Sequence, residues 1–119
     1  MLMGMGVSEV SEGRVIFTCV PHEWHYNPIG VVHGGLAATL LDSAMGCCVQ
    51  TMLPMGVGYT TLELSVNYIR AMTLKTGEVR AIAEIIHSGR QTATAQAKIL
   101  DADSKLYAHG TTTCLILRS

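Results

Sequence analysis

The residues best suited to chemistry in this chain lie together, in the string from Asn27 to Leu36 (Asn-Pro-Ile-Gly-Val-Val-His-Gly-Gly-Leu) and in the apolar segment behind it. Gly34 and Gly35 stand where a helix is expected to begin, and the first N–H groups of a helix have no partner within it. Because glycine has no side chain, a ligand can approach such a backbone closely. This pair predicts either a binding site for a carbonyl or oxyanion, or a flexible helix start packed against a strand.

Asp42 is the second candidate, because no other Asp, Glu, Lys or Arg stands between Glu23 and Glu63. A carboxylate in the middle of an apolar helix is costly unless it has a partner, and such groups are frequent at functional sites. The competing interpretation puts Asp42 on one solvent-facing stripe of the helix, beside Ser43 and Gln50. We favour the functional interpretation.

The spacing of the two candidates has a geometric consequence. Asp42 lies eight residues beyond Gly34, which is roughly 12 Å along a helix axis. A reacting carbonyl must lie about 3 Å from both its donor and its attacking group. One subunit alone cannot meet both distances, whereas a two-fold dimer with antiparallel helices can bring the Gly34 end of one helix opposite Asp42 of the other.

Periodicity predicts one helix and several strands. A hairpin is expected over residues 5–10 and 14–20. Residues 21–35 are rich in Pro, Gly, His and Asn, which predicts an irregular loop. Residues 36–52 are apolar nearly all round and too many for a strand, so we expect a helix that is buried on most faces.

After the helix the hydrophobic period changes to two. Between Tyr59 and Ile69 apolar side chains alternate with polar ones, which is typical of a half-buried strand. Three further strand-like runs follow, at residues 78–87, 91–101 and 106–117, and their short connections make neighbours antiparallel. One helix lying on a meandering antiparallel sheet is an α+β roll.

Composition excludes several classes of protein. The chain of 119 residues suffices for a single domain over residues 1–119, with a core of aliphatic side chains because aromatic residues make up only 5%. A net charge of −1 argues against nucleic acid as the main partner. Seven of the eight Lys and Arg residues nevertheless lie from Arg70 onward, which predicts either a basic patch for a phosphorylated ligand or a solvated strand face.

The four cysteines do not describe a disulfide framework. Cys19 and Cys114 lie in strand-like runs, and Cys47 and Cys48 lie in the apolar helix, so we expect all four to pack as core thiols. Neither a signal peptide nor a membrane span is apparent, and together these features predict a cytoplasmic protein. A hydrophobic share of 49% in so short a chain predicts that a second subunit covers part of it.

The string around Gly34 resembles the signature of PaaI-like hotdog thioesterases, in which Asn-Pro-x-Gly-x-Val-His-Gly-Gly is followed by an Asp nine residues after the His. The similarity extends to the Glu-Gly-Arg-Val hairpin, the end of the strand at residues 67–70, the turn at 87–90 and the closing segment 108–111. It implies the hotdog fold, an α+β antiparallel sheet of five to six strands wrapped around one long central helix. It also implies homodimers that usually pair into homotetramers.

The implied activity is hydrolysis of an acyl-CoA thioester with an aryl or short- to medium-chain acyl group, with no cofactor beyond the coenzyme A of the substrate. Within it, Asp42 is the nucleophile or general base, and the Gly34 N–H of the other subunit polarises the carbonyl. Asn27 orients the carbonyl or the water, Thr61 helps to hold that water, and His33 positions the loop. The residues implied to bind the substrate and its coenzyme A moiety are Val32, Gly35, Arg70, Ser88, Gly89 and Arg90.

Several alternatives and one departure accompany the resemblance. Some relatives carry a hydroxyl residue one turn after the carboxylate, where this chain has Gly46. No Cys-x-x-Cys or His-Glu-x-x-His spacing occurs, so we expect no metal. A non-catalytic acyl-CoA sensor and a hotdog dehydratase are the competing functions. Asp42 together with Asn27 favours the thioesterase over the sensor, because a binder needs neither, and the spacing of His33 and Asp42 is poor for a dehydratase.

Overall fold

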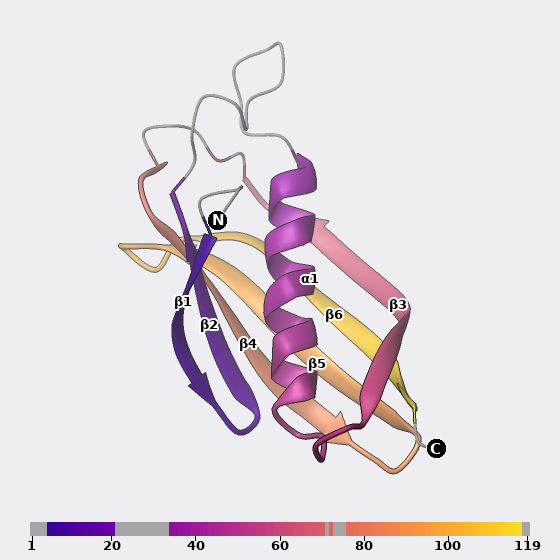
Figure 1. The fold of residues 1–119 in the computed structure, drawn as a ribbon. Helices are drawn as coiled ribbons and strands as arrows, with labels where there is room; N and C mark the ends of the chain where they lie inside the picture. Colours follow the sequence, from indigo (N-terminus) through magenta and orange to yellow (C-terminus); the bar gives the residue numbers. More distant parts are fainter. Residues whose placement is uncertain (1–4, 21–33, 71, 73–75, 118–119) are drawn as a thin grey trace.

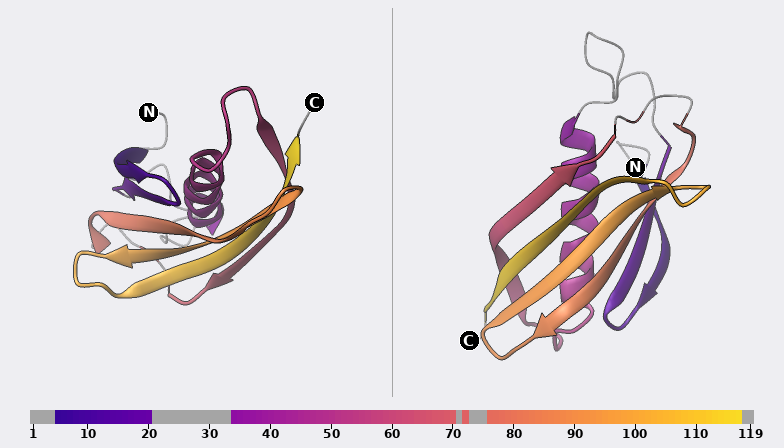
Figure 2. Two further views of the ribbon diagram at one scale, coloured as in Figure 1. Left: turned by 90° about the horizontal axis from the view of Figure 1, so that it is seen from below. Right: turned by 180° about the vertical axis from the view of Figure 1, so that it is seen from behind.

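The computed structural model describes residues 5–20, 34–70, 72 and 76–117, which form one helix and six strands (Figure 1). All six strands join one antiparallel sheet in the order β1-β2-β4-β5-β6-β3. The sheet curves around the helix, which lies along its concave face (Figure 2), and this is the predicted hotdog arrangement. The elements are β1 (Met5–Ser11), β2 (Arg14–Cys19), α1 (Gly34–Gln50), β3 (Gly58–Tyr68), β4 (Val79–Ser88), β5 (Thr92–Asp101) and β6 (Leu106–Leu117).

The predicted order of elements is confirmed, with most bounds shifted by one or two residues. The helix begins at Gly34 and ends at Gln50, so the prediction of a helix over 36–52 was displaced toward the C-terminus. Gly34 and Gly35 therefore belong to the first turn of α1 and not to the predicted loop. The remainder of that loop, residues 21–33, lies outside the described residues.

Small side chains on the sheet let the helix lie close to it. The inward positions of β4 and β5 are largely alanines, which are almost completely buried. The helix fills the space above them with Leu40, Leu41 and Met45, none of which is exposed. This exchange of large against small side chains explains how a core with few aromatic residues packs well. The buried alanines are Ala81, Ala83, Ala93, Ala95 and Ala97.

The helix is not buried all round, because one stripe along it is open in the isolated subunit. Thr39, Asp42, Cys47 and Gln50 are exposed, and at roughly 100° per residue their positions fall within an arc of about 140° around the helix axis. Within the described residues, no helix is long and apolar enough to cross a membrane.

Three of the four cysteines are core residues, as predicted, but the fourth is not. Cys19, Cys48 and Cys114 are buried and all four thiols are free, whereas Cys47 lies on the open stripe of α1. Burial, reinforced by the negative charge of Glu84, raises the pKa of Cys48 to about 11. Cys47 differs because it precedes Cys48 by one residue. This step turns its side chain by about 100° around the helix axis, to the side away from the sheet.

Strand β3 is the edge of the sheet, and three of its apolar side chains are uncovered. Leu62 and Tyr68 are each 58% exposed and Leu64 is 38% exposed. The sequence predicted a half-buried strand, and for the isolated subunit that prediction was wrong. The reason is that β3 pairs only with β6, so its outer edge has no neighbour within the subunit.

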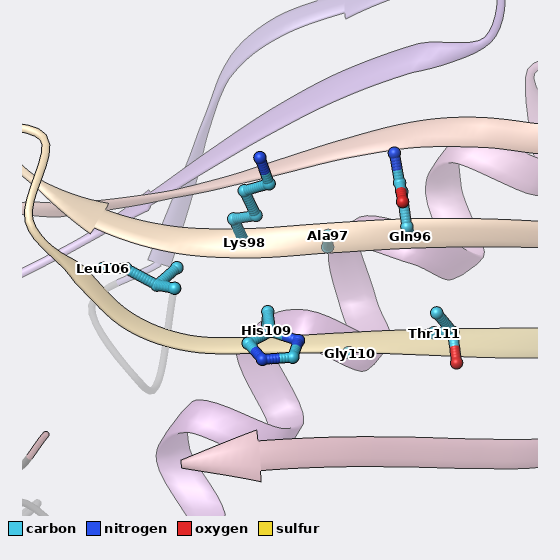
Figure 3. A pocket seen from close by; sticks show the side chains of 7 residues that line it. All are labelled: Gln96, Ala97, Lys98, Leu106, His109, Gly110 and Thr111. Carbon is cyan, nitrogen blue, oxygen red and sulfur yellow. The ribbon is translucent and has the colours of Figure 1, made fainter. Parts of the chain in front are cut away.

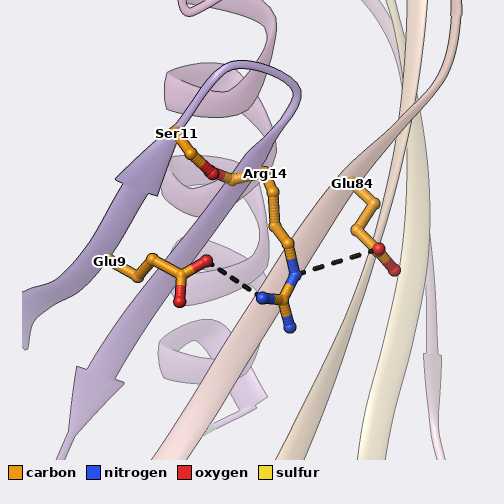
Figure 4. A network of polar contacts seen from close by, with 4 residues as sticks. All are labelled: Glu9, Ser11, Arg14 and Glu84. Carbon is orange, nitrogen blue, oxygen red and sulfur yellow. Dashed lines mark hydrogen bonds and ion pairs between the residues drawn. The ribbon is translucent and has the colours of Figure 1, made fainter.

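At the opposite edge, a charged network ties the first hairpin to β4 (Figure 4). Arg14 donates from Nη1 to Glu9 at 2.9 Å, and its Nε lies 3.9 Å from a carboxylate oxygen of Glu84. All three side chains are largely exposed, so these ion pairs add little to stability. Their charge does protect β1 from pairing with another chain, in contrast to the apolar edge at β3.

Candidate active site

Asp42 lies in the middle of α1 on the open stripe, with its side chain exposed. The prediction of an apolar surround was therefore wrong for the single subunit, and the solvent-facing stripe that the sequence also suggested is what the structure contains. The sheet covers the other side of the helix, where Leu41 and Met45 are fully buried. A carboxylate in this position is accessible to a substrate or to a second subunit.

Gly34 is the first residue of α1 and Gly35 the second, so their N–H groups lie at the positive end of the helix dipole. Asp42 lies eight positions after Gly34 on the same helix, which keeps them roughly 12 Å apart along the axis. Three further predicted site residues, Asn27, Val32 and His33, lie outside the described residues.

Thr61 lies on the side of β3 that faces the helix. It is paired with Cys114 of β6, which is fully buried, and residues opposite each other in an antiparallel pair share a face of the sheet. The Thr61 side chain is exposed at the open edge. Its hydroxyl is thus on the same side of the sheet as Asp42.

Tyr59, two residues earlier on the same face, was not singled out by the sequence. Its hydroxyl lies against Gly46 of α1, where a Cβ atom would overlap it and would approach the ring carbon Cζ to 3.3 Å. Burial raises the pKa of Tyr59, and the nearby Cys114, Cys47 and Asp42 add to the effect. The phenol is therefore protonated at neutral pH. The only sequence signal for it was Gly46, four residues after Asp42.

Arg70 lies just beyond β3, where the start of β6 orients it. Its Nε donates to the carbonyl of Leu106 at 3.0 Å, and its guanidinium lies 6.0 Å from the ring centre of Tyr107. The hydroxyl of Tyr107 in turn donates to Asp101, which is buried. Arg70 thus belongs to a chain of contacts that reaches the turn between β5 and β6.

The connection between β4 and β5 consists of Gly89, Arg90 and Gln91, one residue later than the predicted turn, because Ser88 is the last residue of β4. The Gly89 N–H donates to the carbonyl of Thr92 at 2.8 Å. Arg90, with Gln91, Leu115 and Ile116, lines an open hollow of about 460 Å³. A guanidinium at the rim of such a hollow suits a phosphate.

The structure does not bring Arg70 and Arg90 together within one subunit. Arg70 contacts the first residues of β6, whereas Arg90 lies near its last residues. Ile116 lies nine residues after Tyr107, which is roughly 30 Å of strand. The two arginines are thus far apart within one subunit, and their binding of the coenzyme A phosphates stays a prediction.

A second hollow, of about 280 Å³, lies on the outer face of β5 and β6 (Figure 3). Gln96, Lys98, His109 and Thr111 project from these strands on the side away from the helix. None of the predicted site residues lines it. The candidate site is therefore the opposite face, where the open stripe of α1 borders the edge strand β3.

Comparison with known proteins agrees with this geometry. The sequence profile of the Thioesterase superfamily matches residues 29–108, which are two thirds of the chain. The chain belongs to this family. The match begins five residues before Gly34 and runs through α1 to the start of the last strand, so it contains Asp42, Thr61 and both arginines. Membership makes the chain a thioester hydrolase with the hotdog fold.

Three relatives illustrate the similarity. A Halobacterium salinarum protein provisionally named an esterase is 32% identical over 103 residues, which are 82% of this chain and 66% of that protein. The 1,4-dihydroxy-2-naphthoyl-CoA hydrolase of Listeria monocytogenes is 27% identical over 87% of this chain and 83% of its own length. A single-residue mutant of the phenylacetic acid degradation protein PaaI from Thermus thermophilus superposes with a TM-score of 0.88 at 26% identity, covering 98% of this chain and 96% of that one.

Proposed function

We propose that this hotdog protein hydrolyses acyl-CoA thioesters with an aryl or short- to medium-chain acyl group, in a site that two subunits build together. The observation that carries the proposal is the position of Asp42, exposed on the stripe of α1 beside an uncovered apolar edge strand. The name of the Listeria relative, a CoA hydrolase of an aromatic acid, supports the substrate class. Family membership favours hydrolysis over a sensor or a dehydratase.

The second subunit docks on β3. An edge strand of eleven residues with exposed Leu62, Leu64 and Tyr68 is a template for another strand and a source of buried apolar area. Antiparallel pairing of two β3 strands about a two-fold axis extends the sheet across both subunits and sets the two α1 helices antiparallel. We propose that such dimers pair again into homotetramers.

The axis completes the site if it crosses α1 near Ala38, midway between Gly34 and Asp42. Ala38 is partly exposed on the open side of the helix, so a neighbour can reach it. Gly34 of the partner subunit then lies opposite Asp42, and two equivalent sites form per dimer. The open stripes of α1, which are uncovered in the isolated subunits, line both sites.

Within the site, the thioester carbonyl oxygen accepts a hydrogen bond from the partner's Gly34 N–H, which stabilises the negative charge that develops there. Asp42 either attacks the carbonyl carbon or takes a proton from the water that does so. The carbon–sulfur bond then breaks, the sulfur leaves with a proton as the thiol of coenzyme A, and the acyl group leaves as the free acid. Asn27 and Thr61 orient the carbonyl and the water, and His33 positions the loop.

Coenzyme A lies along the edge that the two subunits share. In the antiparallel dimer, Arg70 of one chain and the partner's Arg90 come to the same end of the joined sheet, although they are far apart within one chain. Guanidinium groups bind phosphates in a bidentate way that lysine cannot match. Ser88 and Gly89 hold the turn of Arg90, and Val32 and Gly35 border the acyl group.

The test is thiol release from a panel of aryl- and alkyl-CoA thioesters by the wild type and by Asp42→Asn. We expect kcat to fall by about 10²–10⁴-fold in the variant, because the amide can neither attack nor take a proton. Glu84→Gln is the matched control, since it also turns an exposed carboxylate into an amide but on the outer face of β4. Full activity of Asp42→Asn on every thioester of the panel would remove the proposed mechanism.

A further inference from the structure

Gly46 and Tyr59 fit together in a way that only glycine allows. Gly46 is buried because the Tyr59 side chain lies over it, and a Cβ atom at this position would overlap the phenol oxygen. An interior glycine weakens a helix by about 0.5–1 kcal/mol relative to alanine. Gly46 therefore lowers the stability of α1, but it allows the Tyr59 hydroxyl to lie directly against the helix.

That hydroxyl lies one turn from the catalytic carboxylate. Residue 46 is four positions after Asp42, so the two positions share a helix face, about 6 Å apart along the axis. Tyr59 reaches this point from the start of β3, on the strand face that also carries Thr61. Asp42 is close enough to influence the phenol electrostatically. The hydroxyl is thus at the border of the site described above.

The phenol is also available for a ligand. In the part of the chain that the structure describes, no hydrogen bond to the Tyr59 hydroxyl is found, although the residue is partly buried. Partly buried hydroxyl groups normally have a partner, either in the protein or in an ordered water. A water beside Asp42 would supply one.

We infer that Tyr59 is a further residue of the thioesterase site, where its hydroxyl holds the water that attacks the thioester while Asp42 takes that water's proton. The inference rests on the proposed function. The water gives one hydrogen to the carboxylate of Asp42, and the phenol oxygen accepts a hydrogen bond from the other, so that a lone pair points at the carbonyl carbon. When the carbon–sulfur bond breaks, the proton held by Asp42 passes to the departing sulfur. Tyr59 keeps its own proton throughout.

Tyr59→Phe tests the inference because it removes the oxygen and keeps the ring. We expect kcat to fall about tenfold, the value of one hydrogen bond to a reacting group, with KM unchanged. A purely structural role for the phenol would lower the stability without separating kcat from KM. The denaturation midpoint of the variant is therefore measured alongside.

A swap of the hydroxyl from strand to helix provides the sharper comparison. Without the phenol oxygen, a Cβ atom at residue 46 meets the ring carbon Cζ at 3.3 Å, which a small shift of the ring accommodates. Gly46→Ser/Tyr59→Phe then supplies a hydroxyl from the helix instead. Gly46→Ala/Tyr59→Phe is the matched control, which fills the same space without oxygen. We expect the serine variant to be about tenfold more active than the alanine variant, at equal stability.

The outcomes separate this inference from the proposed function. If the wild type releases thiol and depends on Asp42, but Tyr59→Phe keeps the full kcat, only the role of Tyr59 is overturned. Equal activity of the serine and alanine double variants overturns it as well. A wild-type chain that hydrolyses none of the thioesters overturns both.

Discussion

Gly110 determines how closely β3 can lie against β6. A Cβ atom on this residue would lie 2.5 Å from the carbonyl oxygen of Ser65, which is backbone and cannot turn aside. A glycine inside a strand often marks such a close approach. The position of β3, which carries Tyr59 and Thr61, thus depends in part on the absence of a side chain at Gly110 of β6.

Gly110→Ala is therefore expected to destabilise the protein by about 1–3 kcal/mol, as measured by chemical denaturation, because β3 must shift to relieve the overlap. Gly58→Ala is the control in the same pair of strands, since a Cβ atom there meets nothing within 4 Å. Equal stability of the two variants would contradict this explanation of Gly110.

The sequence singled out residues that carry an isolated charge. It could not single out residues whose position depends on packing between elements. Asp42 stood out as the lone charge in a long apolar stretch, and Gly34 as the start of a helix. The exposure of Asp42 could not be deduced, because the sheet covers only part of the helix surface. Tyr59 was missed because its contact with Gly46 joins two elements, and Gly46 alone does not indicate which side chain lies over it.

The turn between β5 and β6 is held by one buried carboxylate. Asp101 accepts hydrogen bonds from the N–H groups of Asp103 and Lys105, each at 2.9 Å, and from the hydroxyl of Tyr107 at 3.1 Å. The Lys105 N–H is the largest cause that holds the pKa of Asp101 below its ordinary value of 3.8; burial acts in the opposite direction, and Tyr107 and Asp103 assist. This turn positions Tyr107, and through it Arg70.

A depressed pKa in the folded state means that Asp101 stabilises the fold above its unfolded pKa and loses that contribution as pH falls through the folded value. We expect the difference in unfolding free energy between wild type and Asp101→Asn to shrink when the pH is lowered from about 5 to about 2. Denaturation at several pH values measures it. Asp103→Asn, an exposed neighbour in the same turn, should show no such change.

The elements themselves were predictable because their hydrophobic periods differ. The period of two in β5 matches its alternation of buried and exposed residues, and the long apolar run became α1. The apolar side of β3 was predicted to be half-buried, yet the isolated subunit leaves it open. The proposed dimer accounts for this difference, because a partner on β3 would bury side chains that the isolated subunit exposes.

At the scale of the whole molecule, the proposed site has two halves that one subunit cannot bring together. The helix places Gly34 and Asp42 on one rigid element, eight residues apart, and the sheet opens at β3 beside them. The two arginines lie toward opposite ends of β6. In the proposed dimer, one two-fold axis brings both pairs together. The separation of Gly34 from Asp42 was predictable from residue spacing, whereas the separation of the two arginines required the strand order.

The most direct test of the shared site is complementation between two inactive variants. Asp42→Asn removes the carboxylate, and Gly34→Pro removes the N–H donor at a first helical position, where proline is tolerated. In a mixed dimer of the two, purified through two different tags, one site receives both defects and the other receives neither. We expect the mixed dimer to have about half the wild-type kcat per dimer, although each parent is inactive. A mixed dimer that is as inactive as its parents would show that Asp42 and Gly34 do not act across the interface.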